Sequence, residues 1–173
     1  MLAIRFQTLP PDLELRVKTA LQALTEGKMT DLQAGAFFFK FFFERLDPMY
    51  RDNPPVAITI KEAVKNQLVG LEVPHLVDIT LHITTISDLN FTKGIAFKTP
   101  TMIFNDIKVV EDIILAHSTL PQVLMEKKLK IKRLADILRW LGPIATIQTE
   151  ETLQRVREEE LSILKKLLEE IGY

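Results

Sequence analysis

The sequence predicts an α+β fold, a five-stranded and mostly antiparallel sheet covered by helices. Apolar residues recur with the 3.6-residue period of a helix near both ends of the chain, and with the two-residue period of a strand in its middle. The chain has 173 residues, 47% of them hydrophobic, which is enough for one domain with a sizeable core. We expect a single domain over residues 1–173, with a helical hairpin over 1–54, a core over 55–143 and a C-terminal helix over 144–173.

Two helices are expected near the N-terminus. The first begins at Pro10-Pro11 and ends at Gly27. The second contains residues 37–43, a stretch of seven that holds six of the ten phenylalanines. On a helix, these rings cover about two thirds of the circumference. Thr30 and Gln33 predict a capping box at its start.

This phenylalanine-rich segment is not expected to span a membrane. From Thr30 to Leu46 it would be about 25 Å long at 1.5 Å per residue, and it contains charged residues such as Lys40 and Glu44. We therefore expect a core helix packed on nearly all sides. Contact with lipid or with a partner protein is the alternative.

Five strands are expected in the middle of the chain, over residues 56–60, 77–84, 89–92, 101–105 and 128–132. The segment 68–76 either extends the second strand or forms a wide loop, because Gly70 and Pro74 favour irregular structure. In the last strand, the lysines lie on one face, and Leu129 and Ile131 lie on the other.

Helical spacing returns after the fourth strand. We expect a helix over residues 109–117, a short helical piece near 123–125, a packed helix over 134–141 that ends at Gly142-Pro143, and a long amphipathic helix over 149–171. Glu160 falls on the apolar side of the last helix. Because a buried unpaired carboxylate is costly, we expect either that this side of the helix packs loosely or that Glu160 pairs with Arg157 or with a partner chain.

The block over residues 101–141 contains a strand, a helix, the pair Pro121-Gln122, the basic run Lys128-Leu129-Lys130-Ile131 and an apolar helix, in this order. This order resembles the end of the sterol carrier protein type 2 domain. In that family, a strand and a helix are followed by a Pro-Gln turn, a short helix, a basic strand and a closing helix. Pro121-Gln122 and the run Lys128-Leu129-Lys130-Ile131 match this pattern, and with the earlier strands the resemblance covers about residues 55–143. Family members usually have glycine on both sides of the basic strand, where this chain has Lys127 and Arg133.

The resemblance implies a non-enzymatic protein with an apolar tunnel for a sterol, a fatty acyl chain, an acyl-CoA or an isoprenoid lipid. The residues that would line this tunnel here are Phe38, Phe42, Ile79, Leu81, Phe91, Ile103, Ile113, Leu124, Met125, Leu134, Ile137, Leu138 and Leu141. The alternative is that these residues fill a closed core. The second functional hypothesis is an accessory or scaffold protein of a lipid or isoprenoid-quinone biosynthetic complex, which binds a partner or a second copy through its C-terminal helix.

The basic strand allows two interpretations. Alternating lysines commonly protect the edge of a sheet from aggregation. Alternatively, Lys128, Lys130 and Lys132 bind anionic headgroups or a CoA phosphate during transient contact with a membrane surface. Nucleic acid is not an expected partner, because this segment has no aromatic residue for base stacking and the net charge of the chain is -1.

The sequence offers few groups for catalysis. It has no cysteine, and its three histidines, His75, His82 and His117, match no metal-binding motif. No serine lies in a G-x-S-x-G motif, and no glycine-rich loop could hold a phosphate. We therefore expect no enzyme activity, no metal and no cofactor. The first residues lack the pattern of a secretory signal, so we expect a cytoplasmic protein.

Overall fold

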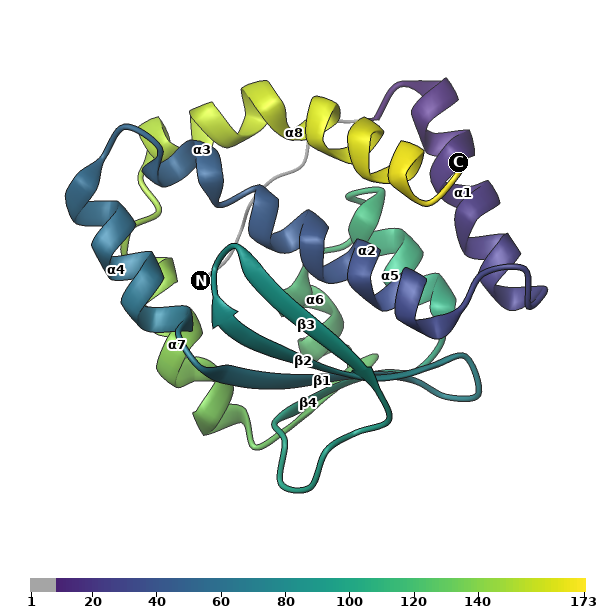
Figure 1. Cartoon of the computed structure of the whole chain (residues 1–173). Helices are drawn as coiled ribbons and strands as arrows, with labels where there is room; N and C mark the ends of the chain where they lie inside the picture. Colours follow the sequence, from purple (N-terminus) through teal and green to yellow (C-terminus); the bar gives the residue numbers. More distant parts are fainter. Residues whose placement is uncertain (1–8) are drawn as a thin grey trace.

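The computed structural model describes residues 9–173 (Figure 1). The elements in chain order are α1 (Pro11–Thr25), α2 (Asp31–Glu44), α3 (Asp47–Tyr50), α4 (Pro54–Val64), β1 (Gln67–Val73), β2 (Val77–Thr85), β3 (Asp88–Lys93), β4 (Thr101–Phe104), α5 (Ile107–Ile114), α6 (Leu120–Met125), β5 (Leu129–Lys132), α7 (Leu134–Thr146) and α8 (Glu150–Glu170). The first residues, on which the expectation of a cytoplasmic protein rests, lie outside the described part.

The five strands form one sheet in the order β3-β2-β1-β4-β5. The pairs β1–β2, β2–β3 and β4–β5 are antiparallel, whereas β1 and β4 are parallel. The α+β class is confirmed, but the sheet is mixed rather than mostly antiparallel. The reason is the connection from β3 to β4, which passes β2 and β1 and brings the chain back beside β1 in the same direction.

The sheet has a buried face and an open face. Side chains that alternate along β1 and β2 are buried on the inner face, including Leu71, Ile79 and Leu81, and the helices gather on this side (Figure 1). Polar residues of the outer face, such as Asp78 and His82, are exposed. The fold is therefore a two-layer arrangement in which one face of the sheet carries the core.

The phenylalanine-rich helix α2 lies between the sheet and α8. It contacts β2 and β3 on one side and α8 on the other. The expected capping box of Thr30 and Gln33 is confirmed. Phe37, Phe39, Phe41 and Phe43 are buried, and Phe38 and Phe42 are partly buried against the same core. The prediction of a core helix is correct, because the protein's own elements cover both sides of α2.

The first expected strand is wrong, since residues 56–60 lie in the helix α4. Asn53 caps α4 with its side chain, and proline occupies the first helical turn. Ile60 and Val64 are buried while Ile58 is exposed, which is the pattern of a helix and not of a strand. The first strand is β1, within the segment that the sequence left open. Its Val69, Leu71 and Val73 alternate into the core.

Two further expectations need correction. The helix α7 does not end at Gly142-Pro143 but continues to Thr146 with Pro143 inside it. The second concerns Glu160, whose partner in the structure is Arg45 rather than the expected Arg157. Its carboxylate lies 3.3 Å from the guanidinium of Arg45, which directly follows α2. The sequence could not show this pair, because its two members are 115 residues apart.

Candidate functional site

An apolar groove lies where α6 and α7 cover the inner face of β4 and β5. Its volume is about 260 Å³. All twelve lining residues are apolar or glycine: Met102, Leu120, Pro121, Leu124, Leu129, Ile131, Leu134, Ile137, Leu138, Leu141, Gly142 and Ala145. The groove therefore offers hydrophobic contact without a polar anchor.

Helix α7 supplies one wall through a single stripe of its surface. Leu134, Leu138, Leu141 and Ala145 recur every three or four residues, so they share one side of the helix. Trp140 faces the core instead, where it stacks on Phe43 with 6.2 Å between the ring centroids. These core contacts hold α7 in place while the stripe stays free to line the groove.

The floor and the second wall come from β4, β5 and α6. Met102 and Ile131 are cross-strand neighbours, and both project to the inner face. Helix α6 starts with a capping box of Thr119 and Gln122. Its buried Val123 fixes the helix on the core, and Leu124 lines the groove.

The mouth of the groove is open to solvent at two leucines of α7. Leu134 is 39% exposed and Leu138 is 53% exposed. Exposed leucines are costly in water, and two of them beside an apolar hollow mark a surface suited to hydrophobic contact.

The residues expected to line a tunnel fall into three groups in the structure. The groove brings together Leu124, Leu134, Ile137, Leu138 and Leu141. Packed into or against the core are Ile79, Leu81, Ile113, Phe38, Phe42 and Phe91. Outside both lie Ile103 and Met125.

Ile103 and Met125 need correction as lining residues. Ile103 pairs with Lys130 on the outer face of the sheet, because the inward residues of β4 are its neighbours Met102 and Phe104. A shift of one residue along a strand changes the face. Met125 lies at the end of α6 and is 81% exposed.

The region beneath α2 is filled with side chains. Phe38 packs edge-to-face on Phe104, with 5.8 Å between the centroids, and Phe39 lies 6.3 Å from Phe91. The void near Phe38 measures only about 20 Å³, which leaves room for about one water molecule. The groove is thus a hollow at one end of the sheet, and among the described residues it shares no lining residue with the void under α2.

Seven lining residues were missing from the sequence prediction: Met102, Leu120, Pro121, Leu129, Ile131, Gly142 and Ala145. The sequence did contain a signal for two of them, because Leu129 and Ile131 alternate with lysines in the basic strand. Strand pairing then selects Met102 opposite Ile131. Gly142 and Ala145 were missed because α7 was expected to end earlier.

The lysines of β5 are arranged as the alternation predicts. Leu129 and Ile131 face the groove, and Lys130 and Lys132 are exposed on the opposite face. Lys128 precedes β5 and lies 2.7 Å from Glu126; this contact raises the pKa of Lys128 through the hydrogen bond and the charge of Glu126. Because β5 is an edge strand, the lysines can protect the sheet edge and still flank the groove.

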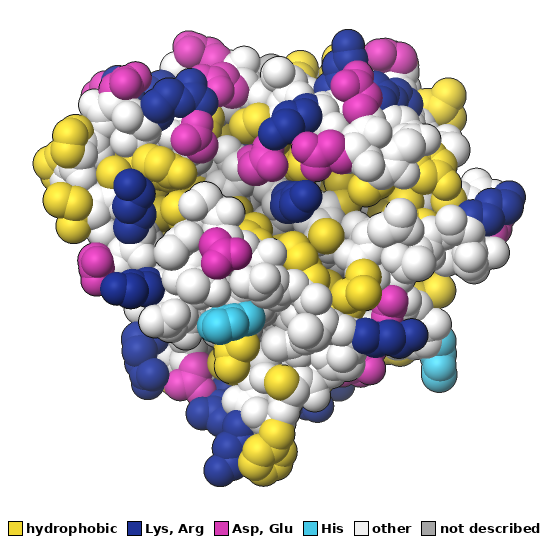
Figure 2. Space-filling view, viewed as in Figure 1, with side chains coloured by type: hydrophobic (Ala, Val, Ile, Leu, Met, Phe, Trp, Pro, Cys, Tyr) yellow, Lys and Arg dark blue, Asp and Glu magenta, His cyan; other side chains and the backbone are white. Residues whose placement is uncertain are grey.

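A larger hollow of about 550 Å³ lies between α2, α3 and α8, and its lining mixes charged side chains with apolar ones such as Phe43 and Ile163. Its charged groups neutralise one another: Arg51 Nη1 and Nη2 each lie 2.9 Å from a different carboxylate oxygen of Glu159, and Lys166 lies 3.3 Å from Glu44. Figure 2 shows acidic and basic side chains alternating in this upper region. Because these positive and negative side chains pair with each other, the hollow has no excess charge that would favour an anionic or a cationic ligand.

Near this hollow, the buried pair of Arg45 and Glu160 joins α2 to α8. Arg45 also donates a hydrogen bond from Nε to the carbonyl of Phe41, at 3.0 Å. Burial lowers the pKa of Arg45 to about 10, while Glu160 opposes this shift. The guanidinium is therefore charged at neutral pH, and the pair serves as a structural link.

Within residues 9–173, no group of three or more His, Asp or Glu side chains is placed to hold a metal ion. No helix of this described part is both long and apolar enough to cross a membrane. In comparisons with models of protein families, with curated proteins and with solved structures, the chain matches none.

Proposed function

We propose that this protein binds a hydrophobic ligand in the groove between α6, α7 and the β4–β5 pair, and that it carries this ligand without catalysis, as in the sterol carrier protein type 2 family that it resembles. The observation that carries the proposal is a hollow of about 260 Å³ lined only by apolar residues and glycine. The order of β4, α5, α6, β5 and α7 along the chain supports the resemblance.

The size of the groove favours a narrow ligand. Small-molecule pockets usually measure about 300–1,000 Å³, and this groove lies just below that range. A single acyl or isoprenoid chain fits such a space better than a rigid multi-ring molecule. Met102 suits a wall that adapts to the ligand, because its unbranched side chain is flexible.

The accessory or scaffold role remains the second hypothesis. It needs a free apolar surface on the C-terminal helix. In the structure, the apolar side of α8, including Val156, Leu164 and Leu168, is buried within the chain, where α8 contacts α1, α2 and α3. The groove is the stronger candidate because its apolar surface remains open.

Leu138→Asp tests the proposal at the mouth of the groove. A carboxylate beside the apolar wall would have to lose its hydration when a ligand binds, so we expect affinity for a fluorescent fatty acid to fall at least about tenfold. The fold should persist, because Leu138 is 53% exposed. Displacement of the fluorescent probe, monitored by titration, measures the change.

Leu15→Asp is the matched control, since Leu15 of α1 is 65% exposed and lies outside the groove. It should bind the probe as the wild type does. Native mass spectrometry of the purified protein should also detect a bound lipid. If the wild type neither carries a lipid nor binds the probe, or if Leu138→Asp binds it unchanged, the proposal is wrong.

A further inference from the structure

The loop over residues 94–100 presents an isolated aromatic side chain to solvent. It connects β3 to β4 and projects from the lower end of the molecule (Figure 1). Phe97 at its tip is 90% exposed. Figure 2 shows hydrophobic atoms flanked by basic side chains at this tip. A ring held this far out of the core is costly in water unless another apolar phase receives it.

The base of the loop is firmly attached to the sheet. The hydroxyl of Thr80 donates to the carbonyl of Gly94 at 2.7 Å and accepts from the amide of Ala96 at 2.9 Å. The amide of Thr99 donates to the carbonyl of Ala96 at 3.2 Å, which closes a tight turn with Phe97 and Lys98 at its centre. The ring is thus presented in a defined position, so little order must be gained on binding.

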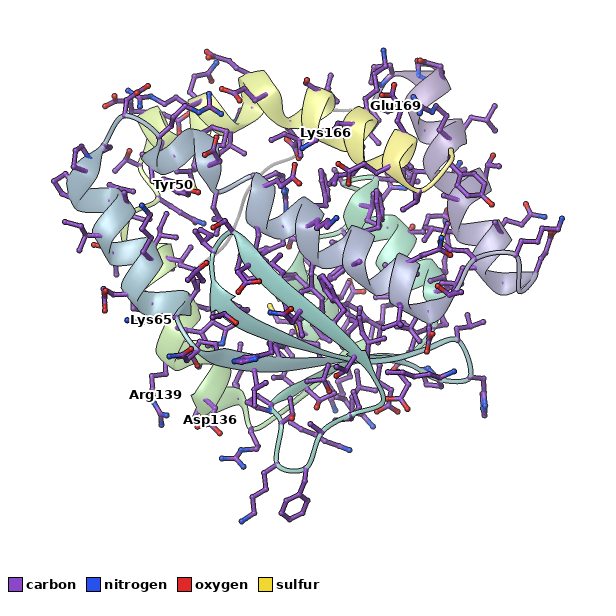
Figure 3. The ribbon with its side chains drawn as sticks, viewed as in Figure 1. Tyr50, Lys65, Asp136, Arg139, Lys166 and Glu169 are labelled. Atoms are coloured by element: carbon purple, nitrogen blue, oxygen red, sulfur yellow. The ribbon has the colours of Figure 1, made fainter. Side chains whose placement is uncertain are left out.

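Basic side chains surround this tip. The ammonium of Lys98 lies 5.3 Å from the centroid of the Phe97 ring. Lys132 is the cross-strand neighbour of Thr101, immediately after the loop, and Arg133 follows it. Arg139 points into solvent from the lower part of the molecule, where the loop also projects (Figure 3), and shares Asp136 with Arg133.

The groove opens at the same end of the β4–β5 pair. Because these strands are antiparallel, the start of β4 and the end of β5 lie together, which places the loop near the first residue of α7, Leu134. Leu134 and Leu138 form the exposed mouth of the groove. A surface that receives Phe97 would therefore lie close to the mouth.

We propose that residues 94–100 dock the protein on an anionic lipid bilayer, with Phe97 inserted at the boundary between headgroups and acyl chains and with Lys98 and Lys132 against the anionic headgroups. Aromatic residues suit this boundary, and nearby cations are attracted to anionic lipid. This inference rests on the proposed function, because the docked bilayer would be the place from which the groove takes its hydrophobic ligand and to which it delivers it.

A bilayer fits this surface better than a protein partner does. A stable protein interface buries about 800 Å² on each side, whereas one ring on a narrow turn offers a small contact. A fluid bilayer needs no matching shape, and it interacts with every cation near the surface.

Flotation with vesicles of phosphatidylcholine, with and without phosphatidylserine, tests the proposal. The wild type should bind the anionic vesicles at low salt, and added salt should weaken the binding. Phe97→Ser should reduce the partition coefficient at least about tenfold, because the ring no longer enters the acyl region. Lys98→Asn should reduce it about fivefold through the loss of one charge. Asparagine tolerates the positive φ of 58° at this position.

Leu15→Ser and Lys165→Asn are the matched controls, since they remove an exposed leucine from α1 and an exposed lysine from α8. Both should bind vesicles as the wild type does. The chain has no cysteine, so Ala96→Cys can carry an environment-sensitive dye next to an intact Phe97. Its emission should shift to the blue on anionic vesicles, whereas a dye at Leu15→Cys should not respond.

Two results would overturn the docking proposal: a wild type that stays free of anionic vesicles, or a Phe97→Ser variant that binds them unchanged. The fatty-acid titration in solution separates this proposal from the function of the groove. Phe97→Ser should retain the affinity of the wild type for the soluble probe. If the wild type does not bind the soluble probe, the proposed function is wrong. Flotation then still decides, on its own, whether the protein docks on vesicles.

Discussion

Gly35 allows α2 to approach the sheet closely. A Cβ atom at this position would overlap Ile79 Cδ1 and would lie 2.9 Å from Ile79 Cγ1. Ile79 is fully buried in β2 and cannot move into solvent. The neighbouring phenylalanines of α2 can reach the sheet only because this one residue has no side chain.

Gly35→Ala should destabilise the protein by about 1–3 kcal/mol. Overpacking of a buried site costs this much, and it outweighs the gain of up to about 1 kcal/mol from replacing glycine in a helix. Urea unfolding monitored by circular dichroism measures the change.

Gly142→Ala is the matched control for this substitution. Gly142 also lies inside a helix, but no heavy atom outside its chain neighbours and the backbone of α7 lies within 4 Å of the position that a Cβ would take there. It should therefore change the free energy of unfolding by less than about 1 kcal/mol, because the gain from replacing a helical glycine is opposed by contact of the new Cβ with the ring of Pro143, the next residue. Ile79→Val removes Cδ1 and should reduce the cost of Gly35→Ala. Equal effects of alanine at both glycines would contradict the role of close packing at Gly35.

Two of the residues whose backbone conformation normally favours glycine flank the strand β5. Lys127 has a φ of 59° and Arg133 a φ of 57°, on either side of β5. These are the two positions where the sterol carrier family usually has glycine. The sequence could not predict these turns, because lysine and arginine rarely adopt the left-handed conformation. The structure has this conformation at both positions, at a cost of about 1–2 kcal/mol for each residue.

At the scale of elements, α8 is held to α2 and α3 by both apolar and charged contacts. Lys166 extends from α8 toward α2 (Figure 3) and reaches Glu44 at 3.3 Å, and Arg51 binds Glu159. These exposed pairs contribute little, typically about 0–1 kcal/mol each. The pair of Arg45 and Glu160 differs because both side chains are buried.

Glu160→Gln should destabilise the protein by about 2–4 kcal/mol, because the buried charge of Arg45 loses the opposite charge that it faces. The double variant Arg45→Met with Glu160→Met should recover much of this loss, since apolar side chains of similar length suit a buried site. Urea unfolding of Arg45→Met, Glu160→Met and the double variant gives the coupling between the residues.

Lys166→Gln is the control for an exposed pair and should change the free energy of unfolding by no more than about 0.5 kcal/mol. If Glu160→Gln costs as little as Lys166→Gln, the buried pair is not the main link. If the double variant loses the sum of the two single effects, its members act independently.

The elements that the sequence predicted well are those with one clear period. Helices α1, α2 and α8 and strand β2 follow their apolar spacing. Helix α4 was missed because Val56, Ile58 and Ile60 alternate like a strand, while Val56, Ile60 and Val64 also fit a helix. Which of these side chains become buried decides between a strand and a helix. Their burial depends on α7, which packs against α4 although it lies far away in the sequence.

For the molecule as a whole, the groove lies where the helical layer ends over the edge of the sheet. The sequence identified the apolar stripe of α7, but it could not distinguish a groove from a closed core. That distinction depends on whether α2 extends over β5. In the structure α2 covers β2 and β3, and the β4–β5 end is left to α6 and α7.

Binding in this groove should stabilise the whole fold. A ligand that binds only the native state at about 100 times its dissociation constant adds about 2.7 kcal/mol to the free energy of unfolding. Gly142→Phe should abolish this gain, because its ring would enter the groove that Gly142 lines. Without ligand it should remain folded, since no atom of another element lies within 4 Å of a Cβ at this position. Thermal unfolding with and without a fatty acid measures both effects.

Gly142→Ala again serves as the comparison, because it makes the same change to the backbone of α7 but adds only a methyl group. It should keep the shift in melting temperature that the ligand produces. Equal ligand-induced shifts in the wild type, Gly142→Ala and Gly142→Phe would show that the ligand binds elsewhere. A shift that is lost only in Gly142→Phe would place the ligand in the groove, since the rest of the lining is the same in all three proteins.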